Sequence, residues 1–163
     1  MPHPAGLLEE LRNGSGGVNG VKLLFQKLEH IYKLPAYQSA GASGMDIYAA
    51  SDEVLPVAIT IAVPTGFAIA IPPGYEAQLR ARSGLALRHN IVLPNAPGTI
   101  DSDYRGEVKI LMLNLGSEKY HIRRGDRIAQ MVIAPVIQAM PTAVKVLPTT
   151  DRGEGGFGST GRQ

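Results

Sequence analysis

The sequence of 163 residues contains no cysteine, so no disulfide bond can hold the fold together. It has four histidines, and none lies four residues from another, which argues against a zinc site. A chain of this length buries roughly two-thirds of its unfolded surface without disulfides or metals. We therefore expect one folded domain stabilised by its own hydrophobic core.

Long runs of one kind of residue are also missing. The sixteen Lys and Arg are dispersed among fourteen Asp and Glu, giving a net charge of +2 at pH 7, so no basic tract attracts nucleic acid. The longest apolar run is much shorter than the ~18 residues needed to span a bilayer. Glu9 and Glu10 stand where an export signal requires an apolar core. We expect a cytoplasmic protein with neither a nucleic-acid nor a membrane partner.

Extended helical periodicity is the third absence. From Val21 onward, short apolar segments alternate with turns that contain Pro and Gly, at nearly regular spacing. The expected strands cover residues 21–28, 58–63, 66–71, 75–82, 90–93, 107–115 and 126–137. The pattern predicts an all-β domain over residues 21–147, built as a sandwich, a jelly roll or a barrel.

Both ends of the chain differ in composition from this central domain. Residues 1–20 form a polar, glycine-rich leader that we expect to be disordered and to which we assign no function. Residues 148–163 are again rich in glycine, and Phe157 is the large apolar side chain among them. Such a segment cannot offset its ordering entropy by burying a core, so we expect it to be flexible.

The C-terminal tail contains the spacing G-x-G-x-x-G at residues 153–158. A dinucleotide site would need a strand before this motif and a helix after it, and the sequence offers neither. Two interpretations remain open. The tail is a frayed terminus, or its glycine amides wrap a polyphosphate together with Arg152, Ser159 and Thr160 while Phe157 stacks on a base.

Two further stretches carry polar groups in places that suggest a ligand. Arg80 and Arg82 fall on one face of an expected strand, which Ser83 and Gly84 then end. Arginines on a strand are usually solvated, but guanidinium, hydroxyl and unobstructed amide within three residues also make a compact anion site. Gln130 interrupts an apolar stripe, and we expect its amide to face a ligand or a subunit interface.

The stretch GTIDSDYRGEVKI, residues 98–110, places two aspartates, a tyrosine and an arginine at the entrance to a strand. A calcium loop is excluded because Arg105 and Met112 stand where oxygen ligands are required. An ordinary turn and a reactive site both remain possible from these residues alone.

Five stretches, in this order, resemble the five motifs of the trimeric deoxyuridine triphosphatase (dUTPase) family. They are GASGMDIYA (41–49), RSGLA (82–86), NAPGTIDSDYRGE (95–107), GDRIAQ (125–130) and RGEGGFGSTG (152–161). The resemblance extends from about Lys22 to the last residue and leaves only the leader outside. Met45, Ile47 and Tyr48 depart from the residues that the family more often shows, which affects packing and no catalytic role.

The resemblance implies a jelly-roll-like β fold and a homotrimer that hydrolyses dUTP to dUMP and pyrophosphate with Mg²⁺. This reaction limits the incorporation of uracil into DNA and supplies dUMP for dTMP synthesis. The resemblance also implies shared active sites. The first, second and fourth motifs come from one subunit, the third from its neighbour, and the flexible tail from the remaining subunit, as a lid.

The family's residue roles transfer to matching positions of this sequence. By resemblance, Asp101 orients and deprotonates the water that attacks the α-phosphorus. Tyr104 packs against the deoxyribose, Asn95 binds the uracil edge, and Phe157 stacks on the base. Backbone groups of Gly98, Thr99 and Ile100 also bind the uracil, and the phosphate-binding set is Arg82, Ser83, Gly84, Gln130, Arg152, Gly158, Ser159 and Thr160.

The resemblance further implies that the triphosphate and water hold Mg²⁺ with no direct protein ligand, and that Asp46 assists through water. Asp103 and Arg105 are expected to be structural partners and Asp126 a turn residue. His89 corresponds to no assigned role.

Two other functions are weighed against this one. A dCTP deaminase shares the fold and needs a Glu for proton transfer, and the sequence offers Glu76 and Glu107 by type but not by motif. A non-catalytic interaction module on the same scaffold would release no pyrophosphate. Release of ammonia from dCTP would identify a deaminase. The absence of any turnover would identify an interaction module.

Overall fold

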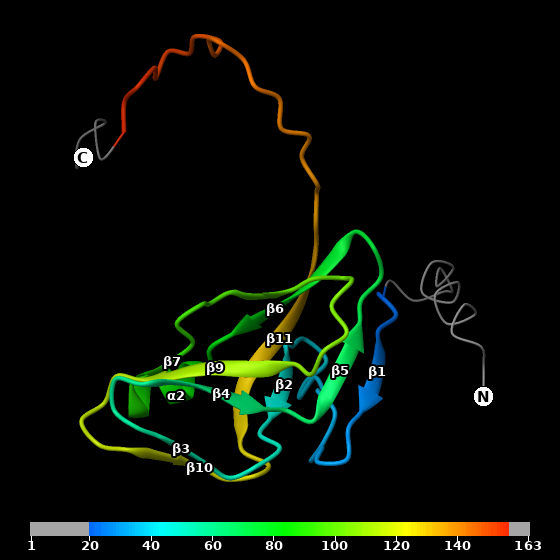
Figure 1. The fold of residues 1–163 in the computed structure, drawn as a ribbon, viewed down its shortest axis with the longest axis vertical. Helices are drawn as coiled ribbons and strands as arrows, with labels where there is room; N and C mark the ends of the chain where they lie inside the picture. Colours follow the sequence, from blue (N-terminus) through cyan, green and yellow to red (C-terminus); the bar gives the residue numbers. More distant parts are fainter. Residues whose placement is uncertain (1–19, 157–163) are drawn as a thin grey trace.

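The computed structural model describes residues 20–156, which fold almost entirely as β-strands (Figure 1). The strands are β1 (Leu24–Lys27), β2 (Met45–Tyr48), β3 (Glu53–Leu55), β4 (Thr60–Pro64), β5 (Phe67–Ala70), β6 (Tyr75–Arg80), β7 (Ile91–Val92), β8 (Gly98–Ile100), β9 (Lys109–Asn114), β10 (Tyr120–Ile122) and β11 (Arg127–Pro135). One short helix, α2 (Ser83–His89), lies between β6 and β7. The sequence-based prediction of an all-β, jelly-roll-like domain is confirmed.

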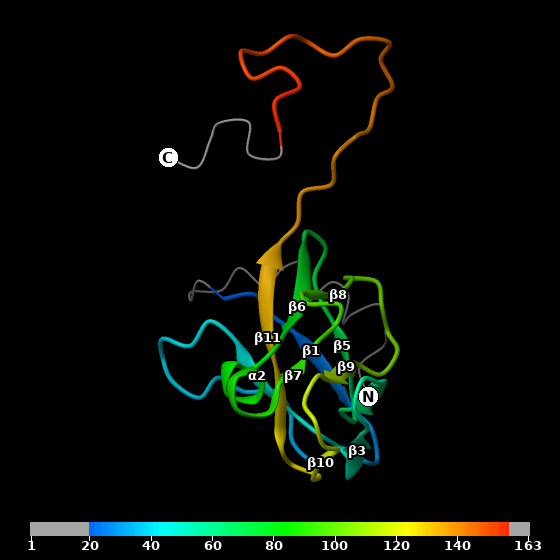
Figure 2. The same ribbon diagram turned by 90° about the vertical axis from the view of Figure 1, so that its left-hand side faces the viewer.

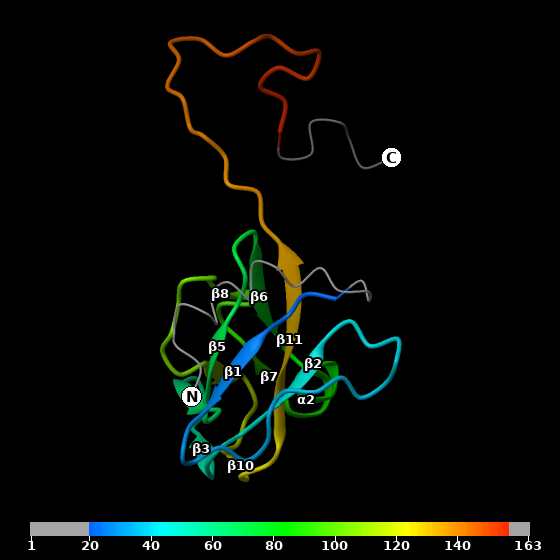
Figure 3. The ribbon, with the colours of Figure 1, turned by 90° about the vertical axis from the view of Figure 1, so that its right-hand side faces the viewer.

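Antiparallel pairs connect these strands into small sheets that pack around one core. The largest sheet has the order β2-β11-β6-β8, and a three-stranded sheet has the order β4-β9-β7. β1 pairs with β5, and β3 pairs with β10. Figures 2 and 3 show β11 running the length of this body, with β1 and β5 side by side.

Alternation of buried and exposed residues explains how the strands form the core. In β9, Ile110 and Met112 are fully buried, whereas Lys109 and Leu111, which alternate with them, face outward. In β5, Phe67 is fully buried and its ring contacts Phe25 of β1, edge to face, with centroids 5.6 Å apart. Each such large apolar side chain contributes about 1.5–3 kcal/mol by burial. The period of two therefore fixes which face of each strand joins the core.

Helix α2 corrects the sequence-based prediction at residues 75–89. The strand expected over residues 75–82 ends at Arg80, so Ser83 and Gly84 begin a helix instead of ending a strand. Asn90 ends the helix in a left-handed conformation and donates its N–H to the carbonyl of Ala86. The helix buries no residue completely, which is why the hydrophobic pattern contains no helical period.

The chain leaves the packed strands after β11, and residues 136–156 extend away from the body (Figures 1, 2 and 3). The strands thus stop at Pro135, before the expected domain boundary at residue 147. No described helix has the length and apolar character required to cross a membrane. The leader of residues 1–20, apart from its last residue, and residues 157–163 lie outside the described part of the chain.

Candidate functional site

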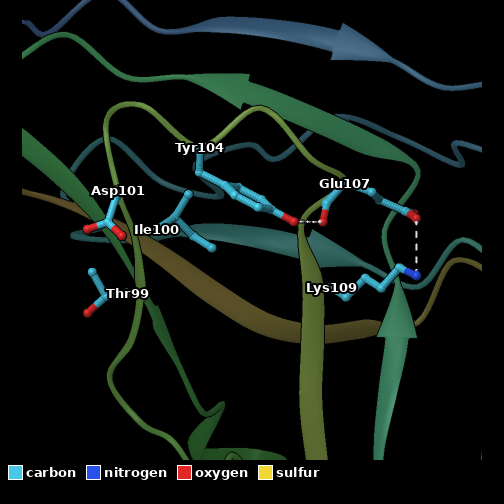
Figure 4. Close-up of a pocket in the computed structure, with 6 residues that line it drawn as sticks. All are labelled: Thr99, Ile100, Asp101, Tyr104, Glu107 and Lys109. Carbon is cyan, nitrogen blue, oxygen red and sulfur yellow. Dashed lines mark hydrogen bonds and ion pairs between the residues drawn. The ribbon is translucent and has the colours of Figure 1, made fainter.

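A pocket of about 440 Å³ opens beside β8, at the stretch of residues 98–110 (Figure 4). Its described lining is Thr99, Ile100, Asp101, Tyr104, Glu107 and Lys109. Asp101 and Thr99 lie at one end, Glu107 and Lys109 at the other, and the ring of Tyr104 lies between them. The structure therefore brings together the expected base, the expected sugar contact and two of the expected uracil-binding positions.

β8 lies at the edge of its sheet, so within residues 20–156 one side of its backbone has no neighbouring strand. Its register with β6 pairs Gly98 with Leu79 and Ile100 with Ala77. The side chain of Asn95 lies against the start of β8. A Cβ added at Gly98 would lie only 2.9 Å from Nδ2 of Asn95. An exposed edge beside a side-chain amide offers the hydrogen-bonding groups that a planar base requires.

The ring of Tyr104 is held at its hydroxyl end by backbone. Tyr104 Oη donates a hydrogen bond to the carbonyl oxygen of Glu107 at 3.0 Å. The ring also passes over Gly106, where an added Cβ would lie 2.7 Å from Cζ of Tyr104. The side chain is 44% exposed, so these two contacts, rather than core packing, fix its position.

The carboxylate of Glu107 is more enclosed, with 17% of its side chain exposed. His30 Nε2 lies 2.7 Å from its Oε1, and the amide of Gly66 donates to the same oxygen at 2.9 Å. Lys109 Nζ lies 3.9 Å from Oε2. Burial acts to raise the pKa of Glu107, but the hydrogen bonds from His30 and Gly66 and the charges of His30 and Lys109 hold that pKa below its ordinary value.

A second group of polar residues gathers around Asp46 in β2, which is almost completely buried. Arg127 Nη1 lies 3.1 Å from Asp46 Oδ2, and Arg82 Nε lies 3.6 Å from Oδ1. Gln130 Nε2 donates to Oδ1 at 3.2 Å. Arg82 also donates to the backbone carbonyl of Arg127 at 3.0 Å. Two guanidinium groups thus share one carboxylate, which leaves an excess of positive charge for an anion.

Two other arginines on the neighbouring strands differ in their relation to this cluster. Arg80 does not join this cluster, since its guanidinium donates to Gln78 Oε1 instead. Arg127 does join it, although no pattern in the sequence indicated this residue. The pairing of β11 with β2 shifts register between Arg127 and Ala129, and this irregularity places Arg127 next to the carboxylate.

The remaining predicted residues have simpler surroundings. Arg105 donates to the carbonyls of Ser102 and Tyr104, and Asp126 accepts from the amide of Arg123 in a turn. Arg152 bonds the carbonyl of Gly155 within the extended tail. His89 packs its ring on Tyr120, with centroids 4.8 Å apart. The remaining tail positions, Phe157, Gly158, Ser159 and Thr160, lie outside the described residues.

One chain does not bring the two groups into contact. Gln130 on β11 pairs with Arg80 on β6, whereas Asp101 follows Ile100, which pairs with Ala77, three residues before Arg80 on the same strand. Gln130 and Asp101 are therefore separated by two strand spacings of about 4.8 Å across the sheet and by several residues of about 3.3 Å each along the strands. The two groups therefore lie apart within one chain.

The fold and the two groups define a jelly-roll-like β protein with a pocket beside β8 and a separate cluster of arginines around Asp46. The family profile described as dUTPase matches residues 31–161, and the chain belongs to the dUTPase family. It is 59% identical over 143 residues to the deoxyuridine 5'-triphosphate nucleotidohydrolase of Zymomonas mobilis, which covers 86% of this chain and 98% of that relative. It is 57% identical over 132 residues to the enzyme of the same name from Rhizobium etli, covering 78% of this chain and 85% of that one.

Solved structures agree with this assignment. The dUTPase of Staphylococcus bacteriophage 80alpha with dUpNHpp superposes with a TM-score of 0.79 at 27% identity, over 86% of this chain and 98% of that one. The D95N mutant dUTPase of phage phi11 has a TM-score of 0.70 at 25% identity, over 77% and 97%, and its description names a structural Mg(II) ion. The family match does not favour the alternative function as a dCTP deaminase.

Proposed function

We propose that this protein hydrolyses dUTP to dUMP and pyrophosphate, as a dUTP diphosphatase. The observation that carries the proposal is the pocket of Thr99, Ile100, Asp101 and Tyr104, which lies within the part of the chain matched to the dUTPase family. The reaction would remove dUTP from the pool of DNA precursors and supply dUMP for dTMP synthesis.

The pocket supplies the groups for binding the nucleoside and activating water. The open edge of β8 and the amide of Asn95 bind the uracil, whose donors and acceptors are exchanged in cytosine. Tyr104 covers the deoxyribose. Asp101 accepts the proton of a water molecule aimed at the α-phosphorus, because an ionised carboxylate can only accept hydrogen bonds.

The cluster around Asp46 binds the phosphates. Asp46 holds the guanidinium of Arg82 and the amide of Gln130 in fixed positions, so that binding costs them little further ordering. Ser83 and Gly84 lie in the first turn of α2, where backbone amides have no acceptor within the helix. These two amides add donors for the phosphates. The tail residues Arg152, Gly158, Ser159 and Thr160 complete the phosphate contacts, while Phe157 stacks on the uracil.

The residues present are compatible with Mg²⁺ carried by the substrate. Asp101 offers an exposed carboxylate at the pocket, whereas both oxygens of Asp46 are already occupied by Arg82, Arg127 and Gln130. Asp46 therefore acts through the side chains that it holds. When bound to the triphosphate and water, Mg²⁺ would neutralise charge on the phosphates.

We further propose a homotrimer in which each site receives Asp101, the phosphate cluster and the tail from different subunits. The segment after β11 supports this arrangement, because several of its apolar side chains are exposed in the described part of the chain. Ile137 is 94% exposed, Met140 93%, Val146 82% and Leu147 77%. Burial against a neighbouring subunit would remove this apolar surface from water and direct the tail toward that neighbour's site.

A substrate panel tests the proposed activity. The purified protein is incubated with Mg²⁺ and dUTP, dCTP, dTTP or UTP, and both pyrophosphate and ammonia are measured. We expect pyrophosphate from dUTP far in excess of the other three, and no ammonia. Release of ammonia from dCTP would show that the protein is a deaminase instead. If no nucleotide yields pyrophosphate or ammonia, the protein is a non-catalytic module.

A further inference from the structure

Tyr104 lies over a short backbone segment that is itself anchored from a distant part of the chain. The ring contacts Gly106 and donates its hydroxyl proton to the carbonyl of Glu107. The carboxylate of Glu107 contacts His30, which lies 77 residues away in sequence. The position of the Tyr104 ring thus depends on where Glu107 is held.

The loop that carries His30 is fixed to the same turn that binds Glu107. Leu28 donates its amide to the carbonyl of Gly66 at 2.9 Å, while the amide of Gly66 donates to Glu107. Gly66 has a φ of +74°, and a Cβ there would lie 2.7 Å from the backbone nitrogen of Ile31. Only glycine permits this close approach of the two backbones. The contact between His30 and Glu107 is therefore built by the fold.

The backbone next to Glu107 is tied to that turn a second time. Val108 donates its amide to the carbonyl of Phe67 at 2.9 Å, and the hydroxyl of Thr65 donates to the carbonyl of Val108. Because the carbonyl of Glu107 shares one planar peptide unit with the amide of Val108, the bond to Phe67 also orients that carbonyl. The contacts of the Glu107 side chain with His30 and Gly66 hold the same residue from its other side.

We propose that His30 and Glu107 form a positioning pair that holds Tyr104 against the sugar and thereby sets the preference for deoxyribose over ribose. The inference rests on the proposed function as a dUTP hydrolase. Neither residue touches the reacting atoms. Their effect is transmitted through the Glu107 carbonyl and the Tyr104 hydroxyl.

The physical reason is that this preference depends on excluding a single hydroxyl group. A pocket that excludes one added hydroxyl by shape alone discriminates by only about a hundredfold. Displacements of about 1 Å have large effects on closely fitted sites. Because Tyr104 is half exposed and lacks core contacts, loss of the anchor lets the ring move and makes room for a 2′-hydroxyl.

The test compares kcat and KM for dUTP and UTP in His30→Ala, Glu107→Ala and the wild-type protein. We expect kcat/KM for dUTP relative to UTP to fall about tenfold or more in both variants, while kcat for dUTP changes less than about threefold. His30→Gln can still donate to Glu107, so it should recover most of the preference. His121→Ala removes an exposed histidine of β10 and serves as the matched control.

A further variant displaces the ring of Tyr104 directly and leaves His30 and Glu107 unchanged. Gly106→Ala would place a methyl group against Tyr104, so we expect the same loss of preference with His30 and Glu107 intact. Unchanged dUTP to UTP ratios in folded His30→Ala and Glu107→Ala would overturn the inference, and so would failure of both variants to fold. If the wild-type protein releases no pyrophosphate from dUTP, the proposed function itself fails, which is a different result.

Discussion

Asp101 follows edge strand β8 directly and lies at the rim of the pocket. Replacing one carboxylate oxygen by an amide removes the proton acceptor and nearly preserves shape. We therefore expect Asp101→Asn to lower kcat for dUTP by about 10²–10⁴-fold, the usual contribution of a general base. Pyrophosphate release measures the rate, and calorimetric titration with non-cleavable dUpNHpp should show nearly unchanged affinity.

The matched control is Asp103→Asn, because Asp103 is an exposed carboxylate in the same loop. It makes the same change of charge two residues away, and we expect wild-type kinetics from it. Near-normal turnover by Asp101→Asn, or an equal loss in the control, would remove Asp101 from the proposed mechanism.

Glu107 gives a residue-scale prediction on pH. Its pKa is lowered in the folded protein, so its stabilising contribution is present above the unfolded value of 4.5 and is lost as the pH falls through the folded value. We expect the free energy of unfolding of the wild type to decline more steeply between about pH 5 and pH 3 than that of Glu107→Gln. Urea denaturation followed by circular dichroism, at one fixed protein concentration, measures both curves.

His30→Gln provides the comparison for that experiment. It keeps the charge of Glu107 and a possible hydrogen bond but removes the charge of His30, so its curve should lie between the other two. Parallel curves for the wild type and Glu107→Gln would show that Glu107 gains nothing from its partners on folding.

At the scale of elements, helix α2 depends on a single residue at its end. Asn90 has φ 54° and ψ 31°, and its side chain is exposed. A branched side chain in this left-handed conformation costs roughly 1–2 kcal/mol, whereas glycine adopts it freely. We expect Asn90→Val to lower the free energy of unfolding by about 1–2 kcal/mol and Asn90→Gly to change it little. Chemical denaturation measures the free energy of unfolding of each variant. Equal values for Asn90→Val and Asn90→Gly would show that the left-handed conformation of residue 90 carries no such cost.

The strands were predictable where one face meets the core. The expected segment 107–115 contains β9, and 126–137 contains β11, because alternating burial leaves a clear period of two. Short elements gave no such signal. β3 and β10 each have three residues, and α2 buries none completely, so neighbouring strands and turns determine them.

The site divides in the same way. Asp101 and Tyr104 were found because a dense group of chemically active residues stood in one short stretch that resembled a family motif. His30 was not predicted, since its contact with Glu107 spans 77 residues and no local pattern encodes it. Arg127 was missed for a similar reason, because a register shift in β11 decides which way it points. Long-range contacts therefore set the part of the site that the sequence could not reveal.

For the whole molecule, the two groups of site residues lie apart in one chain, and residues 136–156 extend from the body (Figure 1). If each site combines three subunits, truncation after Thr150 should leave the trimer intact and suppress hydrolysis. Size-exclusion chromatography with light scattering tests assembly, and pyrophosphate release tests activity. Retained activity in the truncated protein would exclude a role for the tail.

Mixed trimers separate a shared site from a site within one chain. Truncated chains keep Asp101 but lack the tail, whereas full-length Asp101→Asn chains keep the tail but lack the base, so neither homotrimer should be active. When every site takes its base and its tail from different subunits in a fixed rotational order, each mixed trimer contains one complete site, giving about one-third of wild-type activity. When both come from one chain, every mixed trimer is inactive. Refolding the two chains together, isolating hybrids by an affinity tag on one of them and measuring pyrophosphate release therefore distinguishes the arrangements.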